Sequence, residues 1–384
     1  MARLGDIGTI ITGNTPKTND NQNYASSDIS FVKPSDIDDN ELTDLHSSEY
    51  HISEYARDKA RILPPQSILV ACIGIVGKVG INAIECAFNQ QINAIIPDSR
   101  KCNYRYLAYA IQHEKPKLQS IANAPVVPIL NKSQFSDIQV PLPPLEEQRK
   151  IAAVLDKVSD LIAKRRQQLD KLDELVQARF VEMFGDPIIN NMSWPKALIG
   201  DNCFVTKLAG FEYTQYIHYE DSGDVVMVKA QNVKKGKLND KDISFISNEV
   251  SDSLPRSQLA PGDVVMTYVG ANIGDVALID EKHKYHLAPN VAKIRPNSKV
   301  YDSTYFMYML MFLNSYIMEN SADTAKAALG MERIRKLVVC IPPIDLQRYF
   351  SDFVKKIDKS KSVVQKSLEQ LETLKKALMQ EYLG

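Results

Sequence analysis

The chain has 384 residues, of which 44% are hydrophobic and 24% are charged. This composition is typical of folded globular proteins, so extensive disorder is excluded, and the length suffices for two or more domains. The formal net charge of -1 lacks the basic excess of many nucleic-acid-binding proteins and neither supports nor excludes DNA as a ligand. We find no signal-peptide pattern at the N-terminus and no run of about 18 apolar residues. We therefore expect a cytoplasmic protein that does not span a membrane.

The cysteines support the same expectation. They are odd in number, widely scattered and without C-x-x-C spacing, at Cys72, Cys86, Cys102, Cys203 and Cys340. Such a pattern favours reduced thiols over a structural zinc site. The pair His283 and His286 has no third ligand nearby, so we predict no metal site.

In chain order, the elements alternate between short buried strands and helices. Apolar runs bounded by proline and glycine predict strands over residues 67–73 and 263–269, each followed by a glycine turn. Helical patterns cover residues 104–114 and 303–318. The elements predict mixed α/β modules.

The same sequence blocks occur twice. Pro143-Pro144-Leu145-Glu146-Glu147-Gln148-Arg149 returns as Pro342-Pro343-Ile344-Asp345-Leu346-Gln347-Arg348, an offset of 199 residues. Residues 91–97 match 290–296 at that offset, and residues 31–33 match 227–229 at an offset of 196. The chain is therefore interpreted as a tandem duplication with small insertions in its loops.

A long amphipathic helix follows each Pro-Pro pair. Proline at a helix start loses no hydrogen bond, and acidic residues in the first turn complement the helix dipole. We expect the first helix to run from about Leu145 to Phe184, and both helices carry apolar residues at alternating steps of four and three. Arg165, Lys361 and Lys375 fill polar gaps in these stripes. The two stripes predict an antiparallel coiled-coil pair related by a pseudo-twofold axis.

The order of module, Pro-Pro helix, module and Pro-Pro helix closely resembles the specificity (S) subunit of type I restriction-modification enzymes. The resemblance covers essentially the whole chain. It rests on Leu4-Gly5-Asp6, Gly13-Asn14-Thr15-Pro16, the strand and turn ending at Gly74, Asn89-Gln90-Gln91, the segment Pro141 to Gln148, and Phe180 to Pro187. The second copy departs from the pattern, because Gly210-Phe211-Glu212-Tyr213 stands where the first has Gly-Asn-Thr-Pro.

The resemblance implies two mixed α/β target recognition domains separated by a pair of long antiparallel coiled-coil helices. We expect recognition domains over residues 1–142 (module 1) and 187–341 (module 2), and spacer helices over residues 143–186 and 342–384. It further implies that each module reads half of a split, asymmetric DNA site. A stiff helix pair would hold the two readers at a fixed spacing.

Reading base edges needs arginine, lysine, asparagine or glutamine on loops or strand ends. For each candidate, an ordinary surface or turn role is the alternative. The candidates are Lys33, Lys78, Asn89, Gln90 and Gln91 in module 1, and Lys229, Gln231, Asn232, Asn272 and Asn290 in module 2.

Catalysis is not expected on this chain. The Pro-Pro pairs are followed by Leu145 and Ile344 instead of the aromatic residue of an adenine methyltransferase tetrapeptide, and no nuclease motif or P-loop has the required spacing. The resemblance implies partners instead: double-stranded DNA, two methyltransferase (M) subunits, and motor-nuclease (R) subunits for cleavage. These partners would hold S-adenosylmethionine, ATP and magnesium, so this chain would need no cofactor of its own.

The start of each long helix is the predicted partner-binding region. Gln148, Arg149, Gln347 and Arg348 are its candidate residues, with helix capping as the alternative for the two glutamines. Two other functions stay open: a coiled-coil adaptor whose modules bind proteins, and the specificity subunit of a methylation-only system.

Overall fold

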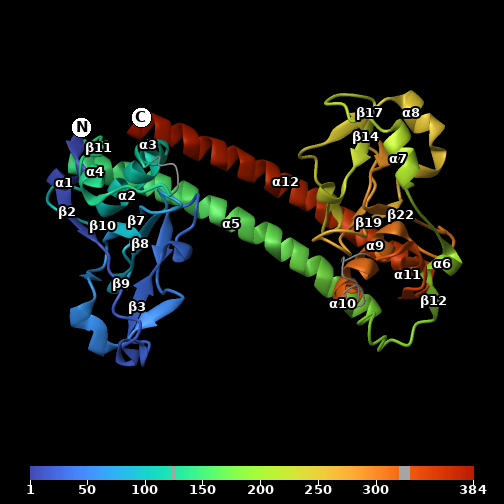
Figure 1. The fold of residues 1–384 in the computed structure, drawn as a ribbon, viewed down its shortest axis with the longest axis horizontal. Coiled ribbons are helices and arrows are strands. Elements are labelled where there is room, and N and C mark those ends of the chain that lie inside the picture. Colours follow the sequence, from blue (N-terminus) through green and yellow to red (C-terminus); the bar gives the residue numbers. More distant parts are fainter. Residues whose placement is uncertain (123–126, 320–328) are drawn as a thin grey trace. The chain divides into compact units, whose positions relative to one another are not determined.

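The computed structural model describes residues 1–122, 127–319 and 329–384. It contains two compact units, of which unit 1 comprises residues 1–167 and 365–384 and unit 2 comprises residues 168–364. Each unit holds one module together with a segment of both long helices, and Figure 1 labels the elements. No helix in the described ranges is both long enough and apolar enough to cross a membrane.

Module 1 contains two sheets. The first has the strand order β2 (Gly8–Thr12), β10 (Ile92–Pro97), β7 (Ile68–Ala71), β8 (Val79–Asn82) and β4 (Thr43–Leu45). The second has the order β5 (Tyr50–Ile52), β3 (Ile29–Val32), β9 (Cys86–Phe88) and β6 (Ile62–Leu63). Strands β3 and β9 are parallel, so the residues after both strands emerge at one edge.

Module 2 repeats this arrangement. Its first sheet has the order β13 (Cys203–Lys207), β22 (Val291–Pro296), β19 (Val264–Thr267) and β20 (Val276–Leu278). Its second has the order β17 (Ser244–Ile246), β14 (Val225–Val228), β21 (Lys284–Leu287) and β18 (Gln258–Leu259), again with its central pair parallel. The predicted duplication and the two buried strands are confirmed.

One local difference separates the modules. Strand β4 of module 1 adds to the edge of the first sheet beside β8, whereas module 2 forms a small hairpin from β15 (Val233–Lys234) and β16 (Lys237–Leu238). Corresponding loops at these two places carry opposite charge. The acidic loop of module 1 contains Asp36, Asp38, Asp39, Glu41 and Asp44, and the basic loop of module 2 contains Lys229, Lys234, Lys235, Lys237 and Lys241.

Helices cover one face of each first sheet. The predicted helix at 104–114 is observed as α2 (Tyr104–His113), but the one predicted at 303–318 breaks at Leu313 into α9 (Ser303–Phe312) and α10 (Asn314–Glu319). The remaining elements are α1 (Leu4–Ile7), α3 (Lys115–Ile121), α4 (Lys132–Ser136), α6 (Ile199–Asn202), α7 (Gly210–Tyr216), α8 (Asn248–Ser253), α11 (Met331–Arg335), and the strand pairs β1 (Ala2–Arg3) with β11 (Gln139–Val140) and β12 (Lys196–Leu198) with β23 (Val338–Cys340).

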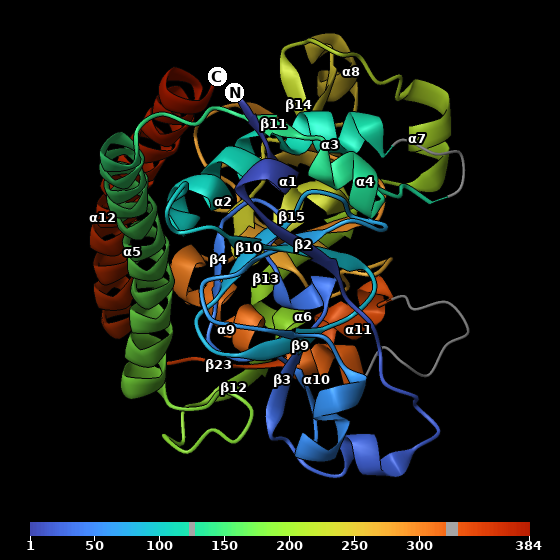
Figure 2. The same cartoon turned by 90° about the vertical axis from the view of Figure 1, so that its left-hand side faces the viewer.

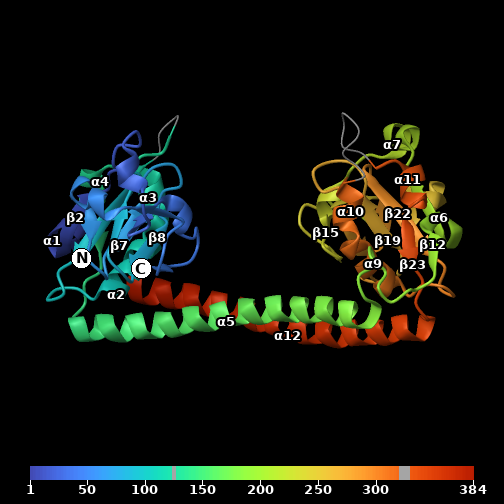
Figure 3. The same ribbon diagram turned by 90° about the horizontal axis from the view of Figure 1, so that it is seen from below.

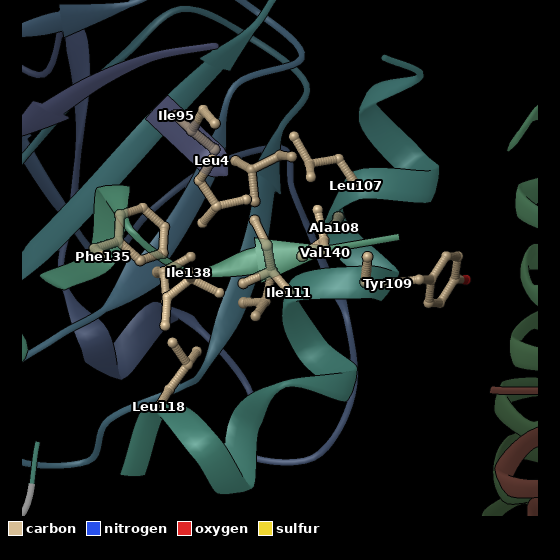
Figure 4. Packing of buried hydrophobic residues seen from close by; sticks show 14 of the residues in the cluster. Leu4, Ile95, Leu107, Ala108, Tyr109, Ile111, Leu118, Phe135, Ile138 and Val140 are labelled. Atoms are coloured by element: carbon tan, nitrogen blue, oxygen red, sulfur yellow. The ribbon is translucent and has the colours of Figure 1, made fainter. Parts of the chain in front are cut away.

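The core of unit 1 lies between the first sheet of module 1 and the helices α1, α2, α3 and α4. Figure 4 shows Leu4, Ile95, Leu107 and Ile111 packed together, all of them buried. Tyr109, also a member of this cluster, points from α2 away from these four side chains, and its hydroxyl donates to Asp156 Oδ1 at 2.7 Å. Because Asp156 belongs to the long helix α5, the module and its helix segment share one packed interior.

The two long helices are α5 (Leu145–Phe184) and α12 (Ile344–Leu383). In unit 1, Leu155 shares a core cluster with Leu383, and Arg166 donates to Glu372 at 2.7 Å. In unit 2, Phe180 packs on Phe350 with ring centroids 5.5 Å apart. Within each unit the helices therefore lie side by side and antiparallel, as the stripes predict (Figure 2, Figure 3). The assignment of domains at residues 142, 186 and 341 stays a prediction.

A buried lysine connects the two sheets of module 2. Lys293 on β22 is 2% exposed, and its Nζ donates to the carbonyls of Arg256 at 2.6 Å and Gln258 at 2.8 Å. Gln258 lies in β18 of the second sheet. Burial lowers the pKa of Lys293 to about 8, because desolvation penalises the ammonium form.

Lys293 makes the stability of unit 2 depend on pH. An unfolded lysine has a pKa of about 10.4, so between pH 8 and that value the unfolded state binds more protons and the folded state gains stability as pH rises. We expect wild type to gain stability relative to Lys293→Met over this window. Urea unfolding followed by the fluorescence of Trp194, the single tryptophan, measures the difference. A difference that does not change with pH would contradict the assignment.

Candidate DNA-recognition surface

Four of the five residues predicted in module 1 line one pocket. Its volume is about 330 Å³. Lys33 and the turn Asn89-Gln90-Gln91 come directly after β3 and β9, so the parallel pairing of these strands brings them together. Thr15, Thr18, Tyr24, Phe31, Tyr50 and His51 complete the lining.

Lys33 presents a positioned cation in this pocket. Its Nζ lies 3.0 Å from the centre of the Tyr50 ring, and Tyr50 is 43% exposed. Strand β5 places Tyr50 opposite Phe31, two residues before Lys33. The aromatic face attracts the ammonium and fixes it at the strand end, where it can meet a phosphate or a base edge.

The three amides of the turn have different roles. Asn89 is buried, and its Oδ1 accepts from the Gln91 backbone at 3.1 Å while its Nδ2 donates to Gln91 Oε1 at 2.8 Å. Asn89 therefore shapes the turn. Gln90 is exposed, and its Oε1 accepts from Thr15 Oγ1 at 2.6 Å, which leaves its amide NH₂ available to a ligand.

The Gly-Asn-Thr-Pro segment packs directly on this turn. The backbone N–H of Asn14 donates to Phe88 O at 3.1 Å, and a Cβ on Gly13 would lie 2.0 Å from Asn89 O. Glycine is required here because any side chain would collide with the neighbouring backbone. The motif thus holds Thr15 against Gln90.

Lys78, the fifth residue predicted in module 1, does not line the pocket and is bonded inside the module. Its Nζ donates to the carbonyls of Pro34 at 3.2 Å and Ile37 at 2.9 Å and lies 3.4 Å from Asp39. Its side chain is 12% exposed. The ammonium organises the acidic loop of module 1, since internal acceptors surround it, and it lies outside the pocket.

Lys229 of module 2 occupies the position equivalent to Lys33. It follows β14, and its Nζ donates to Ser244 Oγ at 3.0 Å and lies 5.9 Å from the centre of the Tyr219 ring. Ser244 faces Met227 across β17 and β14, just as Tyr50 faces Phe31 in module 1. The two modules present the same cation on different surroundings.

The other residues predicted in module 2 divide in the same way. Asn232 is buried, accepts from the Lys229 backbone and donates to the carbonyls of Asn239 and Lys241, so it organises the basic loop. Gln231 and Asn272 are exposed. Asn290 is also exposed and has a φ of 70°, and its backbone carbonyl accepts from the Tyr268 N–H at 3.0 Å.

Lys207 was not among the residues predicted from the sequence, and it lies beside Tyr268. Lys207 ends β13, its Nζ lies 5.3 Å from the centre of the Tyr268 ring, and the ring is only partly buried. Lys207, Tyr268 and Asn290 lie at one edge of the first sheet, because β13, β19 and β22 pair antiparallel there. An aligned repeat could have identified Lys207 as a strand-end residue.

The divergent Gly210-Phe211-Glu212-Tyr213 segment forms helix α7 instead of a turn. Glu212 accepts from the Ala209 backbone at 2.9 Å and pairs with Arg256 at 3.2 Å, while Phe211 is 67% exposed. Module 2 therefore presents the exposed ring of Phe211 in the segment where module 1 presents Thr15.

Gln148 and Gln347 lie inside the protein and not on the predicted partner surface. Both are fully buried. Gln148 accepts from Asn103 N and donates to the carbonyls of Lys101 and Pro143, and Gln347 makes the same three bonds with Asp302, Val300 and Pro342. Each amide joins a module to the start of its long helix. Burial excludes direct contact of these amides with a partner, and the neighbouring Arg149 and Arg348 are exposed.

The described residues hold no group of three or more His, Cys, Asp or Glu side chains that could bind a metal. His283 is exposed and His286 is buried, so the two do not converge. All five cysteines are free, and burial raises the pKa of Cys72 to about 11 and of Cys86 to about 12, which makes these thiols weak nucleophiles.

Comparison with known proteins agrees with this architecture. The family model of the type I restriction modification DNA specificity domain matches residues 1–174 and again residues 206–373. The MjaVIII specificity subunit of Methanocaldococcus jannaschii is 25% identical over 383 residues, which cover 91% of this chain and 88% of the relative. The HindI specificity subunit of Haemophilus influenzae is 29% identical over 188 residues, 47% of this chain and 40% of the relative.

Solved structures share the fold. The S subunit of the type I restriction-modification system of M. genitalium aligns with a TM-score of 0.61 at 12% identity, over 98% of this chain and 94% of that one. A chain of a type I R-M system studied for its complex assembly aligns with a TM-score of 0.56 at 16% identity, over 99% and 96%. Because the family model matches most of the chain in two copies, the protein belongs to the specificity subunits of type I restriction-modification enzymes.

Proposed function

We propose that this specificity subunit recognises a bipartite, asymmetric DNA site and directs adenine-N6 methylation and ATP-dependent cleavage by partner subunits. One observation carries the proposal. The second sheets of the two modules have the same strand order and place Lys33 and Lys229 at the same strand end, but beside Tyr50 in one module and Ser244 in the other. Because the two modules share a fold but place different side chains beside the equivalent lysine, they would recognise two different half-sites.

We assign DNA contact in module 1 to Lys33, Gln90 and Gln91, whose polar groups line the pocket. In module 2 we assign it to exposed or half-buried residues, namely Lys229, Gln231, Asn272 and Asn290, with Lys207 added. Glutamine and asparagine amides read adenine edges, and lysine reads guanine or contacts phosphate. Lys78, Asn89 and Asn232 would act by shaping the loops. We therefore assign the two target recognition domains to residues 1–142 and 187–341.

The helix segments would bind the methyltransferase subunits. In unit 1, the side chains of Val154, Leu161 and Leu374 are 40%, 38% and 46% exposed. In unit 2, Leu175 and Val363 are 47% and 69% exposed. Because each unit exposes apolar helix residues, and Leu175 and Leu374 are equivalent in the repeat, one methyltransferase subunit would bind each unit. Arg149 and Arg348 lie near the starts of the two helices and would contribute polar contacts.

Catalysis would belong to these partners and to motor-nuclease subunits, which would hold S-adenosylmethionine, ATP and magnesium. A solved relative comes from a type I R-M system described for its complex assembly, which supports a role within a larger complex. This specificity subunit would act in the cytoplasm, where its DNA is accessible.

Methylome sequencing tests the proposal. The chain is expressed with its methyltransferase partner in a host without other adenine methylation, as wild type, Lys33→Ala and Lys229→Ala. We expect an interrupted asymmetric motif with N6-methyladenine in both parts. A lost base contact weakens discrimination by roughly tenfold, so Lys33→Ala would relax only one half-site and Lys229→Ala only the other.

Lys101→Ala is the matched control, because Lys101 is an exposed lysine of module 1 whose Nζ donates to Asp6 O at 2.8 Å, beside the Gly8 and Pro97 ends of β2 and β10 and opposite the pocket. We expect it to leave both half-sites unchanged. A continuous palindromic motif, or relaxation of both half-sites by either variant, would contradict the division of labour. Methylation without the partner gene would contradict a non-catalytic role.

A further inference from the structure

Two buried lysines interrupt the apolar stripe of α12. Lys361 is 6% exposed and Lys375 is 8% exposed. An ammonium in such a seam costs free energy unless a carboxylate compensates it. Lys361 pairs with Asp173 of the neighbouring α5, whereas Lys375 Nζ donates to Glu41 Oε2 of module 1 at 2.5 Å. The second seam lysine thus connects the helix pair to the recognition module.

Glu41 contacts both long helices in unit 1. Its Oε1 lies 3.1 Å from Arg166 Nη2 of α5, while its Oε2 accepts from Lys375 of α12. Arg166 also donates to Glu372 at 2.7 Å. The four charges alternate in sign, and Glu41 is bonded by two cations, one from each long helix.

The loop that carries Glu41 is itself firmly held. Asp38 Oδ1 accepts from the backbone N–H groups of Asn40 at 2.8 Å and Glu41 at 2.9 Å, and these bonds lower the pKa of Asp38. From α2, Gln112 Nε2 donates to Asn40 O at 2.9 Å. Glu41 is therefore presented by a turn that is anchored to the body of module 1.

Glu41 lies at the edge of the contact between module 1 and its helix segments. The apolar contact of the module with its helix segments involves Ile151, Leu155 and Leu383. A groove of about 850 Å³, with Lys115 and Lys376 in its walls, borders Glu41 on the same helices. At this border the contact between the module and the helices is therefore ionic and not apolar.

Module 2 lacks an equivalent buried ion pair over its described residues. Lys237 stands at the position of Glu41 in the repeat, and its Nζ lies 4.0 Å from Asp358 with side chains that are 64% and 48% exposed. Module 2 instead packs on its helix segments through aromatic rings, with Phe180 and Phe312 centroids 4.6 Å apart. The buried ionic contact distinguishes module 1.

We infer that Glu41, Arg166 and Lys375 form a joint that fixes the orientation of module 1 on its helix segments and thereby sets where the first half-site is read. These are positioning residues, since none of them is assigned to DNA. The inference rests on the proposed reading of a bipartite site, and it predicts that the joint controls tolerance for spacer length while leaving both half-site sequences unchanged.

Charge reversal tests the joint. Glu41→Lys places a third cation against Lys375 and Arg166, and we expect at least tenfold more methylation at sites whose spacer is one base pair longer or shorter, relative to the wild-type spacer. Glu41→Lys combined with Lys375→Glu should restore the single spacer. Lys237→Glu, the control at the equivalent position, should change spacer preference less than twofold. If Glu41→Lys folds poorly, Glu41→Gln removes the charge at constant size.

Hydrogen exchange of the purified full chain gives an independent readout. We expect faster exchange in residues 36–45 for Glu41→Lys and Glu41→Gln, and recovery in the double variant. Equal loss of methylation at every site with an unchanged spacer, or unchanged exchange, would overturn the joint. Absence of an interrupted motif in wild type would instead refute the proposed function, and the exchange result would still decide on the joint.

Discussion

Replacing Gln347 by leucine should lower the free energy of unfolding of unit 2 by about 3 kcal/mol or more. The fully buried amide accepts from Asp302 N and donates to the carbonyls of Val300 and Pro342 at 2.8 to 3.0 Å. Leucine is similar in size but leaves one buried and two partly buried backbone groups without these partners, and an unsatisfied buried group costs about 1–3 kcal/mol. Urea unfolding is followed by the fluorescence of Trp194, whose Nε1 donates to Phe184 O at 2.9 Å in unit 2.

Two variants serve as controls for Gln347→Leu. Gln365→Leu replaces an exposed glutamine on the same helix and should change stability by less than about 0.5 kcal/mol. Gln148→Leu removes the equivalent three hydrogen bonds in unit 1, and hydrogen exchange at the start of α5 should report the effect of this loss. If Gln347→Leu shifts the midpoint of the unfolding transition no further than Gln365→Leu does, the three hydrogen bonds of the Gln347 amide contribute nothing to stability.

Replacing Phe180 by alanine should destabilise unit 2 by about 3–5 kcal/mol. The ring is fully buried, and its centroid lies 4.6 Å from that of Phe312 and 5.5 Å from that of Phe350. The substitution removes the side chain that joins α5 to α9 and α12, and a cavity remains because the surrounding rings cannot collapse fully. The same Trp194 fluorescence measures the change.

Phe180→Leu keeps much of the volume, so we expect a smaller loss than for alanine. Val181→Ala, at the next residue on α5, removes a side chain that is 45% exposed and should have little effect. A loss below about 1 kcal/mol for Phe180→Ala would show that the aromatic cluster does not hold module 2 on its helix segments.

Most of the fold could be predicted because its signals are local or repeated. The Pro-Pro starts and the seven-residue periodicity predicted α5 at Leu145–Phe184, and the offset of 199 residues predicted two equivalent modules. The break at Leu313 was not predicted, since Ser303 to Met318 is almost continuously apolar and its periodicity does not reveal a helix end.

The candidate site was predictable in part. Lys33 and Asn89-Gln90-Gln91 were chosen by residue type on expected loops or strand ends, and the parallel pairing of β3 and β9 brings them together in the structure. Lys78 and Asn232 share the same residue types and loop positions, but they bind carbonyls of neighbouring loops. Residue type alone could not separate a ligand-facing amine or amide from an internal one.

By itself, the sequence determined the duplication, the helix stripes and the family, because each is written in residues near one another or in repeated blocks. Only the tertiary structure decided which polar side chains are used internally. Lys375 is a defect in an apolar stripe until Glu41, 334 residues away, provides its carboxylate. Gln148 and Gln347 likewise look like surface residues of a helix start until the residues just before α2 and α9 provide their hydrogen-bond partners. Burial and hydrogen-bond partners arise from contacts distant in sequence, and these contacts determine whether a polar group binds a ligand or holds the protein together.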